Sequence, residues 1–158
     1  MNSSRFIFRL VGLIILIGGI SGCATPSSTT SSPKIPLPTD IDIVTPDPNL
    51  PKEIHALSGK WAGTWEHLSG SLDAILIVEK VDKQAAQVIY ASGDNAAWGV
   101  TKSWRREKAS VSYENGKVMV MLPSGIEFWI TKGYDNILEG RRITPHGIVN
   151  IKLKKILN

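Results

Sequence analysis

Few residues in this sequence have both the type and the spacing that catalysis or metal binding requires. The three histidines, His55, His67 and His146, are far apart and form no His-x-His or His-Glu-x-x-His pair. Zinc sites usually draw two ligands from such close pairs, so the spacing argues against one. The sequence predicts turn and surface positions for all three histidines.

The sequence also has no motif that indicates nucleophilic or acid–base catalysis. No Gly-x-Ser-x-Gly elbow, which would expose a serine nucleophile on a sharp turn, occurs in the sequence. Glu66, Asp73 and Glu127 are isolated carboxylates, and such residues usually face solvent. The sequence therefore predicts a protein that is not an enzyme and that uses no metal or cofactor.

The single cysteine, Cys23, directly follows Ile20-Ser21-Gly22. This stretch resembles the lipobox of bacterial lipoproteins, in which the cysteine begins the mature chain and carries a diacylglycerol on its sulfur and an acyl chain on its amine. The resemblance implies lipid attachment at Cys23, and three acyl chains hold a membrane far more firmly than one. With Cys23 acylated, no thiol is left for a disulfide or a metal site.

The residues before Cys23 predict a signal peptide over residues 1–22. Arg5 and Arg9 give a basic start, and an apolar run of only eleven residues, 10–20, follows. A membrane-spanning helix needs about 20 such residues, whereas a basic start, a short apolar centre and small residues at the cut are typical of secretory signals. An uncleaved anchor helix is the alternative. Because Ala24, and not Asp, follows the cysteine, the resemblance implies a place in the cell envelope that, if the cell is Gram-negative, is the outer membrane, facing the periplasm.

Residues 23–52 predict a lipidated, mobile tether rich in Ser, Thr and Pro. Such a segment has little apolar surface to bury and favours extended backbone. The whole chain has a net charge of +4. Arg5 and Arg9 would leave with the signal, so the mature chain would have 16 basic and 14 acidic residues. This small excess gives no reason to expect a nucleic-acid partner.

Residues 53–158 predict one all-β domain. A helical turn or two is expected over 51–57, and after that apolar residues recur with the period of two that marks β-strands. Asn115-Gly116 predicts a type I′ hairpin turn. The expected strands are residues 57–67, 72–81, 87–91, 100–106, 109–114, 117–122, 126–131, 137–143 and 149–154. Eight or nine antiparallel strands with short turns favour a small up-and-down β-barrel, which leaves no open sheet edge, with a two-sheet sandwich as the alternative.

Gly59-Lys60-Trp61, at the first strand, resembles the Gly-x-Trp that opens the barrel in lipocalins and other calycins. The resemblance implies that Trp61 closes one barrel end beneath an arginine from the last strands, either Arg141 or Arg142. The Thr-Asp-Tyr of that family is absent, and the domain is shorter than a typical lipocalin.

Five tryptophans are the most informative side chains of the domain. Trp61 and Trp65 fall on one face of a strand, with Gly63 between them leaving room for a neighbouring ring, and are expected in the core. Trp98 stands in an expected loop, where an aromatic at a barrel mouth can contact a ligand.

The candidate ligand-binding set also includes Lys102, Trp104 and Arg106, which stand at every second position of an expected strand and so share one face. With Trp98 they would form a basic-aromatic patch.

Two functions remain open. One is a membrane-anchored lipoprotein of the cell envelope whose lipocalin-like barrel binds a small apolar or amphipathic ligand. The other is a non-catalytic structural lipoprotein with a solid barrel that meets an envelope protein or glycan.

Overall fold

The computed structural model describes residues 35–156, apart from residues 132, 134, 135 and 146. Cys23, with the expected signal peptide and the first part of the expected tether, lies outside the described residues, as does His146. No helix in the described part of the chain is long and apolar enough to span a membrane.

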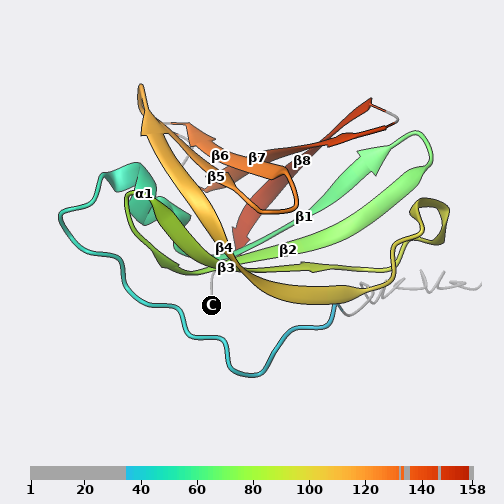
Figure 1. The fold of residues 1–158 in the computed structure, drawn as a ribbon, viewed down its shortest axis with the longest axis horizontal. Helices are drawn as coiled ribbons and strands as arrows, with labels where there is room; N and C mark the ends of the chain where they lie inside the picture. The colour runs from blue at the N-terminus through green and yellow to red at the C-terminus, as the bar shows by residue number, and fades with distance from the viewer. Residues whose placement is uncertain (1–34, 132, 134–135, 146, 157–158) are drawn as a thin grey trace, which may run out of the picture. The chain divides into compact units, whose positions relative to one another are not determined.

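Eight antiparallel strands form a closed barrel in which each strand pairs with the next along the chain and the last pairs with the first (Figure 1). The elements are α1 (Lys52–Leu57), β1 (Gly59–His67), β2 (Gly70–Val81), β3 (Ala85–Ser92), the 3₁₀ turn η1 (Ala96–Trp98), β4 (Ser103–Glu114), β5 (Lys117–Met121), β6 (Ile126–Thr131), β7 (Ile137–Thr144) and β8 (Gly147–Ile156). Residues 60–63 of β1 and 153–156 of β8 close the ring. The up-and-down barrel is confirmed and the sandwich alternative is wrong.

Residues 103–106 of the expected strand 100–106 and the whole expected strand 109–114 belong to a single strand, β4, which is why the barrel has eight strands. The next hairpin turn is confirmed as well. Asn115 and Gly116 have φ values of 51° and 75°, and a type I′ turn requires positive φ at both central residues.

One end of the barrel is closed by α1. Ile54 and Leu57 on this helix are fully buried and belong to the same apolar cluster as the inward residues of the strands. Trp61 lies beneath them, fully buried, and donates its indole N–H to the carbonyl oxygen of Leu57 over 2.8 Å. This contact attaches the end of α1 to the first strand of the barrel, β1. We call it the closed end, and the opposite end the mouth.

The cation above Trp61 is Lys155, so the expectation of Arg141 or Arg142 there is wrong. Lys155 Nζ lies 5.1 Å from the centre of the Trp61 ring and donates a hydrogen bond to the carbonyl oxygen of Ala56. The strand register explains the difference, because Trp61 pairs with Lys155 of β8. Arg141 and Arg142 stand farther along β7, where they pair with Asn150 and Val149.

Two glycines let the barrel wall pack closely. A Cβ on Gly63 would lie 2.3 Å from the backbone oxygen of Lys152, so this glycine makes room for the backbone of β8 and not, as the sequence suggested, for an aromatic ring. Gly140 of β7 serves that purpose, since a Cβ there would lie 2.6 Å from the ring of Phe128. Phe128 fills the barrel centre and is fully buried.

Residues 35–50, which we call the strap, run along the outer face of β2, β3 and β4 (Figure 1, blue to cyan). Ile77 and Ile89 pair across β2 and β3 and lie outside the interior cluster, yet both are fully buried. Val44 donates its N–H to the carbonyl oxygen of Glu79, and Arg106 bonds the Asp40 carboxylate over 3.0 Å. This described part of the expected tether therefore lies against the barrel.

Candidate functional site

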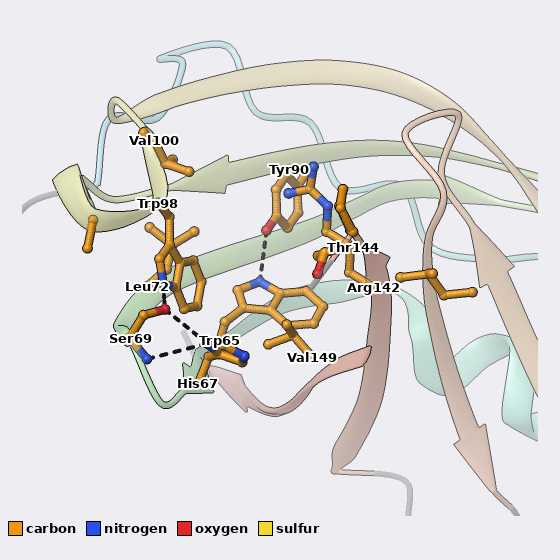
Figure 2. Close-up of a pocket in the computed structure, with 14 residues that line it drawn as sticks. Trp65, His67, Ser69, Leu72, Tyr90, Trp98, Val100, Arg142, Thr144 and Val149 are labelled. Atoms are coloured by element: carbon orange, nitrogen blue, oxygen red, sulfur yellow. Dashed lines mark hydrogen bonds between the residues drawn. The ribbon is translucent and has the colours of Figure 1, made fainter. Parts of the chain in front are cut away.

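A pocket of about 820 Å³ opens at the barrel mouth (Figure 2). It is lined by the end of β1 with its turn into β2, the connection between β3 and β4 that contains η1, and the hairpin of β7 and β8, together with Leu72 of β2 and Tyr90 of β3. The pocket lies opposite α1, so the barrel is plugged at one end and hollow at the other.

Aromatic side chains form the floor of this mouth pocket. Trp65 is 3% exposed and donates its indole N–H to the Tyr90 hydroxyl over 2.9 Å. The Phe128 ring lies below, with its centre 6.3 Å from the centres of both other rings. Because buried polar groups on Trp65 and Tyr90 bond each other, the floor presents mainly apolar ring surface to the pocket.

Burial raises the pKa of the Tyr90 hydroxyl above its ordinary value of 10.0, because an apolar setting disfavours the phenolate. The hydrogen bond from Trp65 and the charges of Arg142 and Arg105 act in the opposite direction without cancelling the effect of burial. Tyr90 is therefore a neutral phenol at physiological pH.

Trp98 forms one wall and is held there from two sides. Its indole N–H donates to Ser69 Oγ over 2.8 Å, and its backbone N–H donates to Asn95 Oδ1 over 3.0 Å. Asn95 also donates its side-chain amide to the carbonyl oxygen of Ser71. His67 lies edge-on to Trp98, with ring centres 6.3 Å apart, and its Nδ1 is 2.9 Å from Ser69 Oγ. These contacts fix the loop that contains Trp98 to the turn between β1 and β2.

Arg142 supplies positive charge to the pocket. It pairs with Val149 on the inward face of β7 and β8, and both residues line the pocket. No ion pair or hydrogen bond holds the Arg142 side chain among the described residues. Arg105, across the barrel beside Tyr90, is instead paired with Glu107. No acidic residue of the described chain lines the pocket, so its single arginine is not neutralised there.

The structure divides the candidate residues proposed from the sequence. Trp98 lines the mouth pocket, as a loop aromatic at a barrel mouth should, and its contact with a ligand stays a prediction. Trp104, Lys102 and Arg106 do not line it. Trp104 lies on the outer face and is 42% exposed, Lys102 lies 3.8 Å from the Asp94 carboxylate, and Arg106 binds the strap and Glu79. The expected basic-aromatic patch therefore does not extend into the pocket.

Three pocket residues were missed or misassigned from the sequence. His67 was expected at the surface and is exposed, but it also lines the pocket. Tyr90 drew no attention, and Arg142 was assigned to the opposite barrel end. Alternation was the available signal: Leu138, Gly140 and Arg142 share a face, and that face points inward.

Comparison with known proteins shows no family for this chain, so the chain is classified by its fold. No protein-family model and no curated protein matches the chain. Among solved structures, a redesigned β-barrel is similar, with 12% sequence identity over 66% of this chain and 96% of that chain and a TM-score of 0.47. The class that the strand pairing itself defines is an eight-stranded antiparallel up-and-down β-barrel. Within the described residues, no cluster of three or more His, Cys, Asp or Glu side chains is arranged to hold a metal ion.

Proposed function

We propose that this protein is a membrane-anchored envelope lipoprotein whose barrel binds a small apolar or amphipathic ligand in the mouth pocket. The observation that supports this most directly is the combination of an aromatic floor with one unneutralised arginine in a pocket of about 820 Å³. Small-molecule sites are typically about 300–1,000 Å³, mostly apolar, with a few polar groups that orient the ligand.

The pocket chemistry favours an amphipathic ligand with an anionic group. An alkyl or ring portion would cover Trp65, Leu72 and Val149, which are buried or nearly so at the pocket base. A carboxylate or phosphate would meet Arg142, whose planar guanidinium can donate two parallel hydrogen bonds to such a group.

We assign no catalytic role to His67 and Ser69, although their side chains lie 2.9 Å apart. Ser69 Oγ already accepts the indole N–H of Trp98, and the Ser69 backbone N–H donates toward His67 Nδ1 over 3.3 Å. A catalytic pair also needs a third group that orients the base, and none bonds the His67 imidazole within the described residues. The effect of His67 and Ser69 is to position Trp98.

The anchoring part of the proposal depends on Cys23. Cys23→Ser is expected to abolish lipid attachment and to move the protein from the membrane fraction to the soluble fraction. Intact mass of the purified wild-type protein would disprove the anchor if it showed residues 1–22 retained and Cys23 unmodified.

Ligand binding is tested by tryptophan fluorescence during titration with a medium-chain fatty acid and with the alcohol of equal chain length. We expect a saturable change with both and tighter binding of the acid. Arg142→Gln should abolish the preference for the acid, while Arg141→Gln should preserve it, because Arg141 pairs with Glu127 on the outer face. A flat titration with every probe would refute the binding function.

A second candidate, a structural or interaction lipoprotein with a solid barrel, draws on a different observation. Below the floor the barrel is filled by fully buried side chains, among them Phe128, Leu76 and Leu153. Under this alternative the mouth pocket takes no small molecule, and an envelope protein or glycan binds the outer surface. The same titration separates the two candidates.

A further inference from the structure

Three aliphatic side chains stand exposed around the mouth. Leu68 is 102% exposed in the turn between β1 and β2, and Ile143 and Ile148 are 70% and 58% exposed on the hairpin of β7 and β8. Ile143 pairs directly with Ile148. Glu66 of β1 pairs with Asn150 of β8, and Leu68 and Ile148 each lie two residues from this pair toward the mouth. The three residues therefore follow one another along the rim, and we call them the apolar rim.

The strap gives the direction from which the chain reaches the barrel. Ile35, the first described residue, lies beside Gly93, whose ideal Cβ position is 3.9 Å from Ile35 Cγ1. Gly93 follows β3 at the mouth and bonds the carbonyl oxygen of Asp73. Farther along, Asp40 reaches Arg106, and Val44 reaches Glu79 nearer the closed end. The chain thus arrives at the mouth and runs toward α1.

This direction limits the distance between Cys23 and the mouth. Twelve peptide units separate Cys23 from Ile35, and a chain spans at most about 3.3–3.6 Å per residue, so the reach is at most about 40 Å. Were the strap detached, the 29 units from Cys23 to Lys52 would allow about 100 Å. With the strap docked, the chain therefore enters the barrel at the mouth, which is the end nearer to Cys23 along the chain.

We propose that the apolar rim docks on the surface of the membrane that holds the Cys23 anchor, so that the mouth pocket faces the lipid. This inference rests on the lipid anchor of the proposed function. These three are the most exposed large hydrophobic side chains of the described chain. Such a group marks a surface that another apolar phase covers, and the entry of the chain at the mouth makes the lipid bilayer the nearest such phase. An amphipathic ligand then passes between bilayer and pocket without crossing bulk water.

The test uses the full lipidated protein in vesicles of phosphatidylethanolamine and phosphatidylglycerol, after intact mass has shown acylation of Cys23. Because acylated Cys23 offers no free thiol, single cysteines can be introduced by Leu68→Cys and Ile148→Cys and spin-labelled. Lys83→Cys, in the exposed turn between β2 and β3 at the closed end, is the matched control.

We expect the labels at positions 68 and 148 to be relaxed more by oxygen, which concentrates in lipid, than by a water-soluble nickel chelate. The label at position 83 should show the reverse. Equal, water-like accessibility at all three positions would overturn the proposal. So would labels at 68 and 148 that are shielded from both reagents, since a second copy or another protein would then cover the rim.

The fatty-acid titration on the same vesicles keeps this inference separable from ligand binding. Saturable binding with water-exposed labels would reject docking alone, whereas lipid-embedded labels with a flat titration would reject the ligand pocket alone. Ile148→Ser provides a functional measure, because Ile148 does not line the pocket. It should slow transfer of the fatty acid from vesicles at least tenfold while leaving affinity in detergent solution unchanged.

Discussion

Trp98 and Ser69, 29 residues apart in the chain, are joined by a 2.8 Å hydrogen bond from the indole N–H to the hydroxyl oxygen. The bond connects the loop after β3 to the turn after β1, and both segments line the mouth pocket. The position of the Trp98 ring therefore depends on a residue that a sequence motif would not associate with it.

Removing that hydroxyl should loosen the pocket wall. In Ser69→Ala the indole N–H loses its partner, and we expect about a tenfold loss of fatty-acid affinity, equivalent to about 1.4 kcal/mol, with little change in the free energy of unfolding. Ser124→Ala, in the turn between β5 and β6, is the control and should bind normally. Unchanged affinity in Ser69→Ala would show that the bond does not organise the site.

Arg106 is expected to hold the strap on the barrel. Its guanidinium contacts Asp40 and the Glu79 carboxylate, and Glu79 is only 5% exposed. Arg106→Ala leaves that buried carboxylate without its cation, so urea denaturation should show a clear fall in the free energy of unfolding. Residues 35–50 should also become sensitive to protease.

The control for this change is Arg141→Ala, which breaks the more exposed pair with Glu127 and should cost about 0.5 kcal/mol. Equal effects of the two substitutions would contradict a special role for Arg106.

Gly140 should tolerate no added methyl group. In Gly140→Ala the new Cβ would meet the Phe128 ring at 2.6 Å and Ile151 Cγ2 at 2.9 Å, so overpacking should destabilise the barrel by about 1–3 kcal/mol. Gly93→Ala is the matched control, because its Cβ would find its nearest neighbour at 3.8 Å. That variant should stay within about 0.5 kcal/mol of wild type. Thermal denaturation of both variants provides the comparison, and equal midpoints would disprove the packing argument.

The raised pKa of Tyr90 predicts that the folded protein loses stability in alkali. Burial raises its folded-state pKa above the ordinary 10.0, so between these two values the unfolded chain has released a proton that the folded chain still binds. The contribution is fully present below pH 10 and declines as pH rises from there through the folded-state pKa. In Tyr90→Phe the free energy of unfolding should be lower at neutral pH, because Trp65 loses its acceptor, but should fall less steeply above pH 10. Parallel curves for the two proteins would refute this assignment.

Strand alternation carries most of what the sequence predicts about the fold. Val149, Ile151 and Leu153 are buried on one face of β8 while Asn150, Lys152 and Lys154 are exposed on the other, as their period of two indicates. The number of strands was left at eight or nine, because residues 100–106 and 109–114 were expected as two strands. Arg105 and Glu107 in fact point inward and bond each other, so the strand continues through them.

The site was less predictable, because it depends on which strand ends meet. Trp98 could be placed at a mouth from its loop position alone. The assignment of Arg142 required the register between β7 and β8, which shifts it to the end opposite Trp61. The strap was missed for a related reason: Ile77 and Ile89 signal a buried outer face only once both are known to point away from the interior.

The pairing of β1 with β8 also bears on how the chain folds during synthesis. Lys60 meets Ile156 across this seam, so the barrel cannot close until almost the last described residue has left the ribosome. Barrels with such distant contacts fold in milliseconds to seconds, far more slowly than helical bundles. The barrel of a nascent chain therefore stays open until β8 has been synthesised.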